Sequence, residues 1–98
     1  MKLELSLRAV REIEACARAW REAHPAAAER FGEELRAAFE QLRAAPRAGV
    51  LYPAMRGREH RRVLLRECGQ HVYYRVVGAD RVRVVAVWGA APRRAPAR

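Results

Sequence analysis

Two amphipathic helical segments joined by almost no linker constrain the fold of this chain most strongly. From Leu7 to about Ala23 the larger apolar residues recur at helical spacing, namely Val10, Ile13, Ala17 and Trp20. The break falls at His24-Pro25, because a proline disfavours helical geometry in the preceding residue and suits the first turn of a new helix. A second helix is predicted from Pro25 to Ala44 or Ala45. Two such helices must fold back as an antiparallel hairpin whose apolar stripes need a common surface to cover.

That surface is predicted to be a small sheet. Leu3 and Leu5 alternate with polar residues in a short N-terminal strand, while residues 46–59 have loop composition, with Pro46, Gly49, Pro53 and Gly57. Three more strands follow, over residues 62–65, 71–77 and 81–88, separated by two tight turns. The predicted class is α+β with the order βααβββ, in which the helical hairpin packs on one face of a twisted, mainly antiparallel sheet.

Strand alternation then predicts what each sheet face carries. One set is Val72, Tyr74 and Val76, and the residues expected opposite it are His71, Tyr73 and Arg75. In the last strand the alternating set is Val82, Val84, Ala86 and Trp88, with Arg83 opposite. One face is therefore expected to be apolar and covered by helices, and the other to collect cationic and aromatic groups. The pattern leaves open which parity points inward.

Charge is distributed unevenly along the chain. From Arg56 onward eleven arginines stand against three acidic residues, whereas residues 1–55 carry nine basic and eight acidic residues. A one-sided positive field attracts polyanions or acidic protein segments and says nothing about the fold. The expected partners are therefore acidic.

Length and composition bound the remaining possibilities. The 98 residues suit one domain, expected over 1–89, and residues 90–98 are too poor in large apolar side chains to pack, so a flexible basic tail is expected there. The chain lacks an apolar run long enough to span a bilayer and an N-terminal signal pattern, which predicts a cytoplasmic protein without a membrane partner. Cys16 and Cys68 match no metal-ligand spacing, so no metal and no cofactor are expected.

Most enzyme classes are excluded by missing residues. Ser6 is the only serine and begins a helix, and the glycines are scattered singly, so serine hydrolases and phosphate-loop enzymes are ruled out. Metal-free RNA cleavage needs a proton acceptor, a proton donor and cations near the phosphate. Suitable types stand at Arg62, Arg66, His71, Tyr73 and Arg75. Arginines at exposed strand positions also protect sheet edges from aggregation. The pattern alone therefore does not decide between RNA cleavage and this structural role.

The order and spacing of several segments resemble the RelE/ParE superfamily of bacterial toxins. These are the βααβββ order itself, the helix pattern Ala27-Ala28-Glu29-Arg30-Phe31, Met55-Arg56-Gly57, Arg62-Val63-Leu64-Leu65, Val72-Tyr73-Tyr74-Arg75-Val76 and Val82-Arg83-Val84-Val85-Ala86-Val87-Trp88-Gly89. The resemblance implies a toxin encoded beside an antitoxin, whose C-terminal segment wraps and silences it in a hetero-oligomer. One branch, RelE-like, cleaves messenger RNA on the ribosome; the other, ParE-like, inhibits DNA gyrase and is not a nuclease.

Residue by residue, the comparison favours the ParE-like branch. Arg62 and Arg66 fit basic strand positions of the nuclease branch, but Leu64 stands where that branch has a further basic residue between them. His71 stands where an arginine is expected to open the next strand. Ala90 and Ala91 follow the last strand in place of basic residues, and no tyrosine occurs beyond Tyr74. These losses remove phosphate-stabilising charge and a stacking aromatic. The bases that many ParE-like chains carry directly after the last strand appear here only at Arg93-Arg94.

The favoured hypothesis is thus a ParE-like gyrase inhibitor without catalytic residues or sequence-specific nucleic-acid binding, neutralised by an acidic antitoxin segment. Predicted target contacts are Arg75, Arg83, Trp88, Arg93 and Arg94, and predicted antitoxin contacts are Arg61, Arg62, Arg66 and Tyr73. One alternative is a ribosome-dependent RNase that uses Arg62, Arg66 and His71. The other is a non-toxic basic binding module, which would leave cell growth normal and bind nucleic acid in a strongly salt-dependent way.

Overall fold

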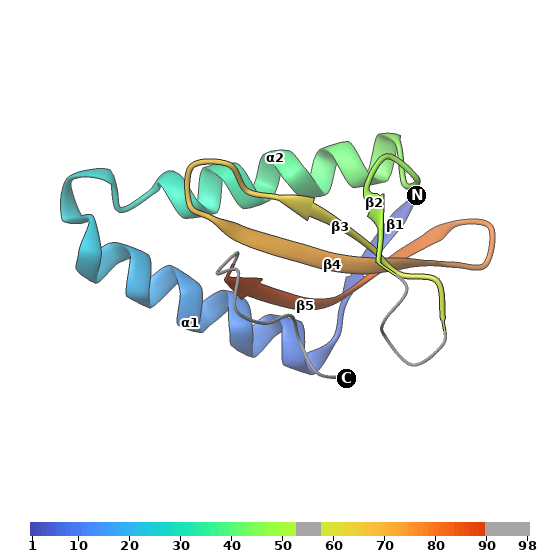
Figure 1. Cartoon of the computed structure of the whole chain (residues 1–98), viewed down its shortest axis with the longest axis horizontal. Helices are drawn as coiled ribbons and strands as arrows, with labels where there is room; N and C mark the ends of the chain where they lie inside the picture. The colour runs from blue at the N-terminus through green and yellow to red at the C-terminus, as the bar shows by residue number, and fades with distance from the viewer. Residues whose placement is uncertain (53–57, 90–98) are drawn as a thin grey trace.

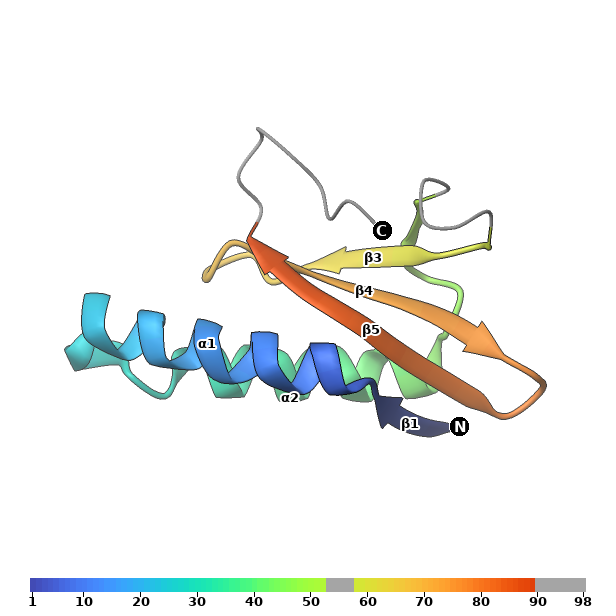
Figure 2. The same cartoon turned by 90° about the horizontal axis from the view of Figure 1, so that it is seen from below.

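The protein, described by a computed structural model over residues 1–52 and 58–89, has two layers. The elements, in chain order, are β1 (Lys2–Leu5), α1 (Leu7–Ala23), the 3-10 turn η1 (Pro25–Ala27), α2 (Arg30–Ala44), β2 (Val50–Leu51), β3 (Arg61–Leu64), β4 (Gln70–Val77) and β5 (Arg81–Gly89) (Figure 1). The sheet has the order β1-β5-β4-β3-β2, with β1 parallel to β5 and every other pairing antiparallel. Figure 2 shows both helices on the same side of this sheet.

The predicted α+β class, the helical hairpin and the bounds of the first helix are confirmed. The second helix begins at Arg30 rather than at Pro25, because Pro25–Ala27 forms a 3-10 turn. Trp20 explains this difference: its indole Nε1 donates a hydrogen bond to the Ala27 carbonyl at 2.8 Å, and its ring stacks on His24 at 3.9 Å between centroids. The contacts of Trp20, a residue of α1, therefore hold this turn in place. The local sequence does not reveal them.

The strand β2 lies inside the segment predicted to be a loop. Val50 pairs with Arg62 and Leu51 with Arg61. Two residues are too few to show an alternating pattern, and proline and glycine lie on both sides of them. Pairing with β3, not local propensity, makes this stretch a strand.

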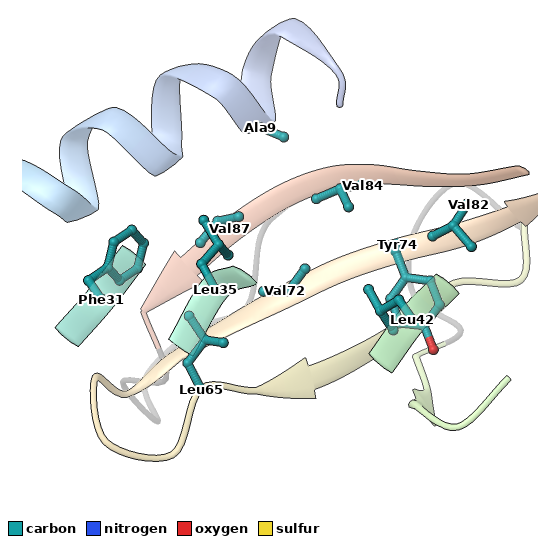
Figure 3. Packing of buried hydrophobic residues seen from close by; sticks show 10 residues of the cluster. All are labelled: Ala9, Phe31, Leu35, Leu42, Leu65, Val72, Tyr74, Val82, Val84 and Val87. Atoms are coloured by element: carbon teal, nitrogen blue, oxygen red, sulfur yellow. The ribbon is translucent and has the colours of Figure 1, made fainter. Parts of the chain in front are cut away.

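The core lies between the helices and the sheet. Figure 3 shows its buried side chains: Ala9 from α1, Phe31, Leu35 and Leu42 from α2, and Leu65, Val72, Tyr74, Val82, Val84 and Val87 from the sheet side. The set containing Val72 and Tyr74 is therefore the inward one on β4, and the side chains of Tyr73 and Arg75 fall on the opposite face.

On β5 the predicted alternation is wrong beyond Val84. Tyr73 pairs with Ala86 and Tyr74 with Val84, so Val85 is an extra residue, a β-bulge. The bulge reverses the parity, and Val87 joins the helix-facing core in place of Ala86. Ala86 and Trp88 pack with Tyr73 in a second, smaller cluster.

The start of α1 covers the edge of β5 that β1 leaves open. Beyond Leu5, the Ser6 N–H donates to the Val84 carbonyl at 2.9 Å, and the Ser6 hydroxyl donates to the Val85 carbonyl at 3.1 Å. A carboxylate oxygen of Glu12 then accepts the Val87 N–H at 2.8 Å. These bonds satisfy exposed strand groups and fix where α1 lies on the sheet.

Candidate functional site

The sheet face away from the helices, here called the open face, carries an aromatic and cationic cluster. Arg62 lies directly across from Tyr73, and His71 from Trp88. The Tyr52 and Tyr73 rings meet edge to face at 5.1 Å, and the Arg62 guanidinium lies 5.1 Å from the Tyr52 ring centroid. The predicted concentration of such groups on one face is thus observed.

A groove of about 410 Å³ opens along β3 and is lined by residues of α2, of the loop before β2, of β3 and of β4. Its lining contains Arg62, Arg66 and His71, together with Gln41, Ala48, Gly49, Val50, Val63 and Leu64. Arg62 comes from β3, Arg66 from the turn after it, and His71 from the start of β4, opposite Leu64. The turn between β3 and β4 therefore brings together the three residues that the RNase alternative requires.

One wall of the groove is a loop that is anchored to the sheet at two points. The buried Gly49 N–H donates to the Tyr74 hydroxyl at 2.9 Å. The Arg61 guanidinium donates to the carbonyls of Arg47 and Gly49 at 3.0 and 2.9 Å. Burial raises the pKa of Tyr74, so the phenol stays protonated at neutral pH. The wall is a fixed part of the fold.

The groove combines a neutral imidazole, that of His71, with two arginines, Arg62 and Arg66, that form no ion pair within the described residues. Burial, and then the charge of Arg62, lower the pKa of His71 from its ordinary value of 6.5, so the ring is uncharged at neutral pH. Neither the Arg62 nor the Arg66 guanidinium has a carboxylate oxygen within 4.0 Å in the described part of the chain. The groove therefore suits an anionic group.

The four predicted antitoxin contacts differ in accessibility. The Arg61 side chain is engaged with backbone carbonyls, and Tyr73 is only 1% exposed. Arg62 is half-buried and Arg66 exposed, and both line the groove. Contact with an antitoxin stays a prediction. Of the four residues, Arg62 and Arg66 are the ones whose side chains line the groove.

The predicted target contacts do not form one group. Arg75 and Arg83 lie opposite each other at one end of the β4–β5 pair, where Arg83 donates to Glu4 at 2.9 Å. The hydrogen bond from Arg83, together with nearby Arg81, keeps the pKa of Glu4 below its ordinary value despite some desolvation. Trp88 lies at the other end, with the Arg8 guanidinium 5.5 Å from its ring centroid. Arg93 and Arg94 lie outside the described residues.

Glu34 is a further positioning residue that sequence reasoning missed. Its carboxylate accepts the N–H groups of Glu67 at 2.9 Å and Cys68 at 3.1 Å, which ties α2 to the turn that carries Arg66. Burial acts to raise the pKa of Glu34, but the backbone hydrogen bonds outweigh it and the pKa is lowered. Burial and Glu34 together raise the pKa of Cys68 to about 11. Nothing in the local sequence distinguishes Glu34 from the other carboxylates of α2, because its partners lie 33 and 34 residues away along the chain.

Two kinds of site are not found in the described residues. In the part of the chain spanning 1–52 and 58–89, no three His, Cys, Asp or Glu side chains lie close enough together to hold a metal ion. Over the same residues, no helix has the length and apolar character needed to cross a bilayer. Cys16 and Cys68 are free thiols, both partly buried.

Comparison with protein families decides the identity. The family model described as "ParE toxin of type II toxin-antitoxin system, parDE" matches residues 3–92. The chain belongs to the ParE toxin family. The predicted superfamily and branch are thereby confirmed, over nearly the whole chain.

A solved toxin–antitoxin structure has the same fold as this ParE-family chain. A structure entitled "Chromosomal ParDE TA system from P. aeruginosa" superposes with a TM-score of 0.71, covering 91% of this chain and 95% of that one. The two sequences are 16% identical, a likeness that shows the fold alone. Comparison with curated protein sequences gives no significant match.

Proposed function

We propose that this chain is the toxin of a type II toxin–antitoxin pair and that it acts in the cytoplasm by inhibiting DNA gyrase. The observation that carries the proposal is the ParE family match over residues 3–92. The resemblance of the chain to the ParE-like branch implies gyrase as the target. Over the described residues, Tyr73 is buried and Tyr52 is half-buried against the groove-lining Arg62.

A cognate antitoxin is the second part of the proposal. The ParE family is described as one half of a toxin–antitoxin system, and the structural neighbour is entitled as a ParDE system. This chain carries a net charge of +9, and Arg62 and Arg66 have no ion-pair partner within the described residues. An acidic antitoxin segment would neutralise that charge, and such segments commonly fold as they bind. The expected product is a hetero-oligomer.

The experiment is a gyrase assay with the purified full chain. Supercoiling of relaxed plasmid and accumulation of gyrase–DNA cleavage complexes are measured while the toxin is titrated against the enzyme. Inhibition of supercoiling that disappears when the antitoxin is premixed supports the proposal. Unchanged supercoiling and unchanged cleavage complexes at a large molar excess of toxin contradict it.

Arg75 offers a variant for mapping the target surface. Its side chain has no ion pair in the described residues, whereas its neighbour Arg83 is held by Glu4. If Arg75 contacts gyrase, Arg75→Glu should weaken inhibition by about tenfold. Losing a charged contact typically costs about 1.4 kcal/mol of binding free energy or more, which corresponds to that factor. Arg18→Glu, which changes the same charge on the exposed face of α1, is the matched control.

A second candidate function, ribosome-dependent RNA cleavage, is favoured by one observation. Arg62, Arg66 and the neutral His71 line the same groove, which supplies two cations and one proton acceptor. The ring of Tyr73 lies 5.9 Å from that of His71 between centroids, and Tyr73 is only 1% exposed. Among the described residues that line the groove there is no tyrosine to give a proton to the leaving oxygen.

Primer extension on a translated messenger separates the two candidates. The gyrase proposal predicts no cleavage products above those of a control without toxin. Cleavage that disappears in His71→Ala and persists in His24→Ala would establish the nuclease instead.

A further inference from the structure

The outer edge of β1 is unpaired. The Lys2 N–H donates to the Asp80 carbonyl at 2.8 Å, and the Ser6 N–H also donates to a carbonyl at β5. Every second residue from Lys2 to Ser6 therefore directs its backbone groups toward β5, and the intervening Leu3 and Leu5 direct theirs away from it. Because β1 is the last strand on its side of the sheet, no strand of the described residues pairs with these groups. Leu3 and Leu5 can therefore pair with a strand from another molecule.

The side chains of β1 differ between its two faces. Leu3 packs against the helix-facing core, and Leu5 lies on the same face but is 37% exposed. Met1, at the next alternate position, is 40% exposed. Lys2 and Glu4 point to the opposite face. Exposed apolar side chains along an unpaired edge mark a surface that another strand can cover.

Lys2 and Glu4 differ in their ionic contacts. The Glu4 carboxylate accepts hydrogen bonds from Arg83 at 2.9 Å and from Arg81 at 3.3 Å, both on β5, and stays partly exposed. Lys2 forms no ion pair within the described residues. The edge thus carries one unpaired cation and one carboxylate that is still accessible to a further donor.

We propose that this edge binds a second copy of the chain, through antiparallel pairing of β1 with β1. In a two-fold arrangement centred on Leu3, the two Leu3 residues exchange backbone hydrogen bonds. Met1 of one copy then lies opposite Leu5 of the other, and Lys2 lies opposite Glu4. The two sheets become one continuous sheet across the dimer.

Backbone geometry and charge select this register. The outward backbone groups belong to odd-numbered residues, so the pairing can shift only in steps of two residues. A shift in one direction places Lys2 opposite Lys2, and a shift in the other places Glu4 opposite Glu4. Like charges directly opposite each other are destabilising. Only the register centred on Leu3 joins opposite charges on one face and apolar side chains on the other.

An acidic segment of another protein fits this edge less well than a second copy does. The two arginines beside the edge, Arg81 and Arg83, already bond to Glu4, and Glu4 itself repels a carboxylate. A second copy supplies both the cation that Glu4 can accept and the carboxylate that Lys2 lacks. The edge is complementary to itself, as a two-fold interface requires.

Salt should strengthen the dimer. The net charge of +9 opposes association of two copies at long range. Salt screens this repulsion over about 8 Å at physiological ionic strength, but it weakens the apolar contacts and backbone hydrogen bonds much less. Binding of an acidic partner would show the opposite dependence, because salt screens attraction between unlike charges.

The test begins with sedimentation equilibrium of the full chain between about 1 μM and 1 mM. A monomer–dimer equilibrium is expected, with a dissociation constant that falls as salt is raised. NMR should show slower amide exchange at Leu3 and Leu5 as the protein concentration increases. A chain that stays monomeric at about 1 mM, or a dimer that leaves exchange at both residues unchanged, overturns the proposal.

A charge reversal tests the register. Lys2→Glu should raise the dissociation constant by about tenfold or more, because it places two carboxylates opposite each other. Arg18→Glu, on the exposed face of α1, lowers the net charge equally and should leave dimerisation unchanged or slightly stronger. Adding Glu4→Lys to Lys2→Glu should restore the dissociation constant to within about threefold. Equal effects of the two single variants, or no rescue, overturn the register.

Proline substitution tests the backbone pairing. Leu5→Pro removes an N–H that points away from β5, so it should abolish the dimer and keep the fold, as proline is tolerated on an edge strand. Leu7→Pro is the matched control, since it replaces another exposed leucine at the first residue of α1, where proline is favoured. Circular dichroism checks the fold of both variants. Equal dimerisation of the two would contradict the proposal.

The inference goes beyond the proposed function and does not depend on it. A dimer formed by a chain that has no effect on supercoiling would refute the gyrase target alone. Inhibition of gyrase by a chain that stays monomeric would refute the dimer alone.

Discussion

The backbone N–H of Gly49 is buried against the hydroxyl of Tyr74, to which it donates a hydrogen bond of 2.9 Å. A Cβ atom at residue 49 would lie 2.5 Å from that hydroxyl oxygen and 2.9 Å from the Arg62 carbonyl oxygen. A residue of the loop and a residue of the central strand thus fix the wall of the groove, and with it the position of β2.

Gly49→Ala should accordingly lower the free energy of unfolding by about 2 kcal/mol, because backbone and a buried ring must move to admit the methyl group. Urea unfolding followed by circular dichroism measures the loss. Gly89→Ala is the matched control, since a Cβ there meets nothing within 4 Å among the described residues, and it should change stability by less than about 0.5 kcal/mol. Equal stability of the two variants would show that the close approach of Gly49 to Tyr74 does not contribute to stability.

Tyr74→Phe tests the other side of the same contact. It keeps the buried ring and removes the acceptor of the Gly49 N–H, which leaves a buried donor unpaired at a cost of about 1–3 kcal/mol. Thermal unfolding measures the effect, and amide exchange at Gly49 should quicken more than exchange at Val72, which lies in β4 with Tyr74. An unchanged exchange rate at Gly49 would mean that the hydrogen bond contributes nothing.

Glu34 should make the stability of the protein depend on acid pH. Its pKa in the folded state lies below the ordinary value of 4.5, so its contribution is fully present above that value and is lost as the pH falls through the folded pKa. In Glu34→Gln this part of the acid destabilisation should be absent. Unfolding free energies measured between about pH 6 and 3 test it, with Glu22→Gln, at an exposed position of α1, as the control.

Glu12 should stabilise the fold through the edge of β5. Glu12→Ala removes the acceptor of the Val87 N–H and the partner of Arg8, whose Nε lies 2.9 Å from the carboxylate. A loss of about 1–3 kcal/mol is expected, because a partly buried strand donor is left without a partner. Denaturant unfolding of this variant beside Glu14→Ala, an exposed residue of the same helix, separates the effect from helix propensity. Similar losses in both would contradict it.

The imidazole of His71 should titrate below its ordinary pKa of 6.5, because burial and then the charge of Arg62 oppose protonation. NMR chemical shifts of the ring against pH measure it directly. Arg62→Gln removes the second cause and should move the midpoint upward, whereas Arg18→Gln should leave it in place. A midpoint above 6.5 in the unmodified chain would show that neither cause operates.

Much of this architecture follows from local pattern. The bounds of α1, the helical hairpin, the order of the long strands and the placing of Val72 and Tyr74 on one sheet face all follow from periodicity, since each reflects which side chains must leave water. Which of the two faces points inward was decided by the structure. The grouping of Arg62, Arg66 and His71 was also foreseeable, because a tight turn places the end of one strand beside the start of the next.

The sequence by itself determined the two amphipathic helices, the strands that they cover and the excess of arginine on one half, because periodicity and charge are properties of neighbouring residues. Only the tertiary structure decided the bulge at Val85, the strand at Val50–Leu51 and the role of Glu34. Each of these depends on which backbone or carboxylate group from a distant segment reaches a given N–H or C=O, and local composition does not encode that choice.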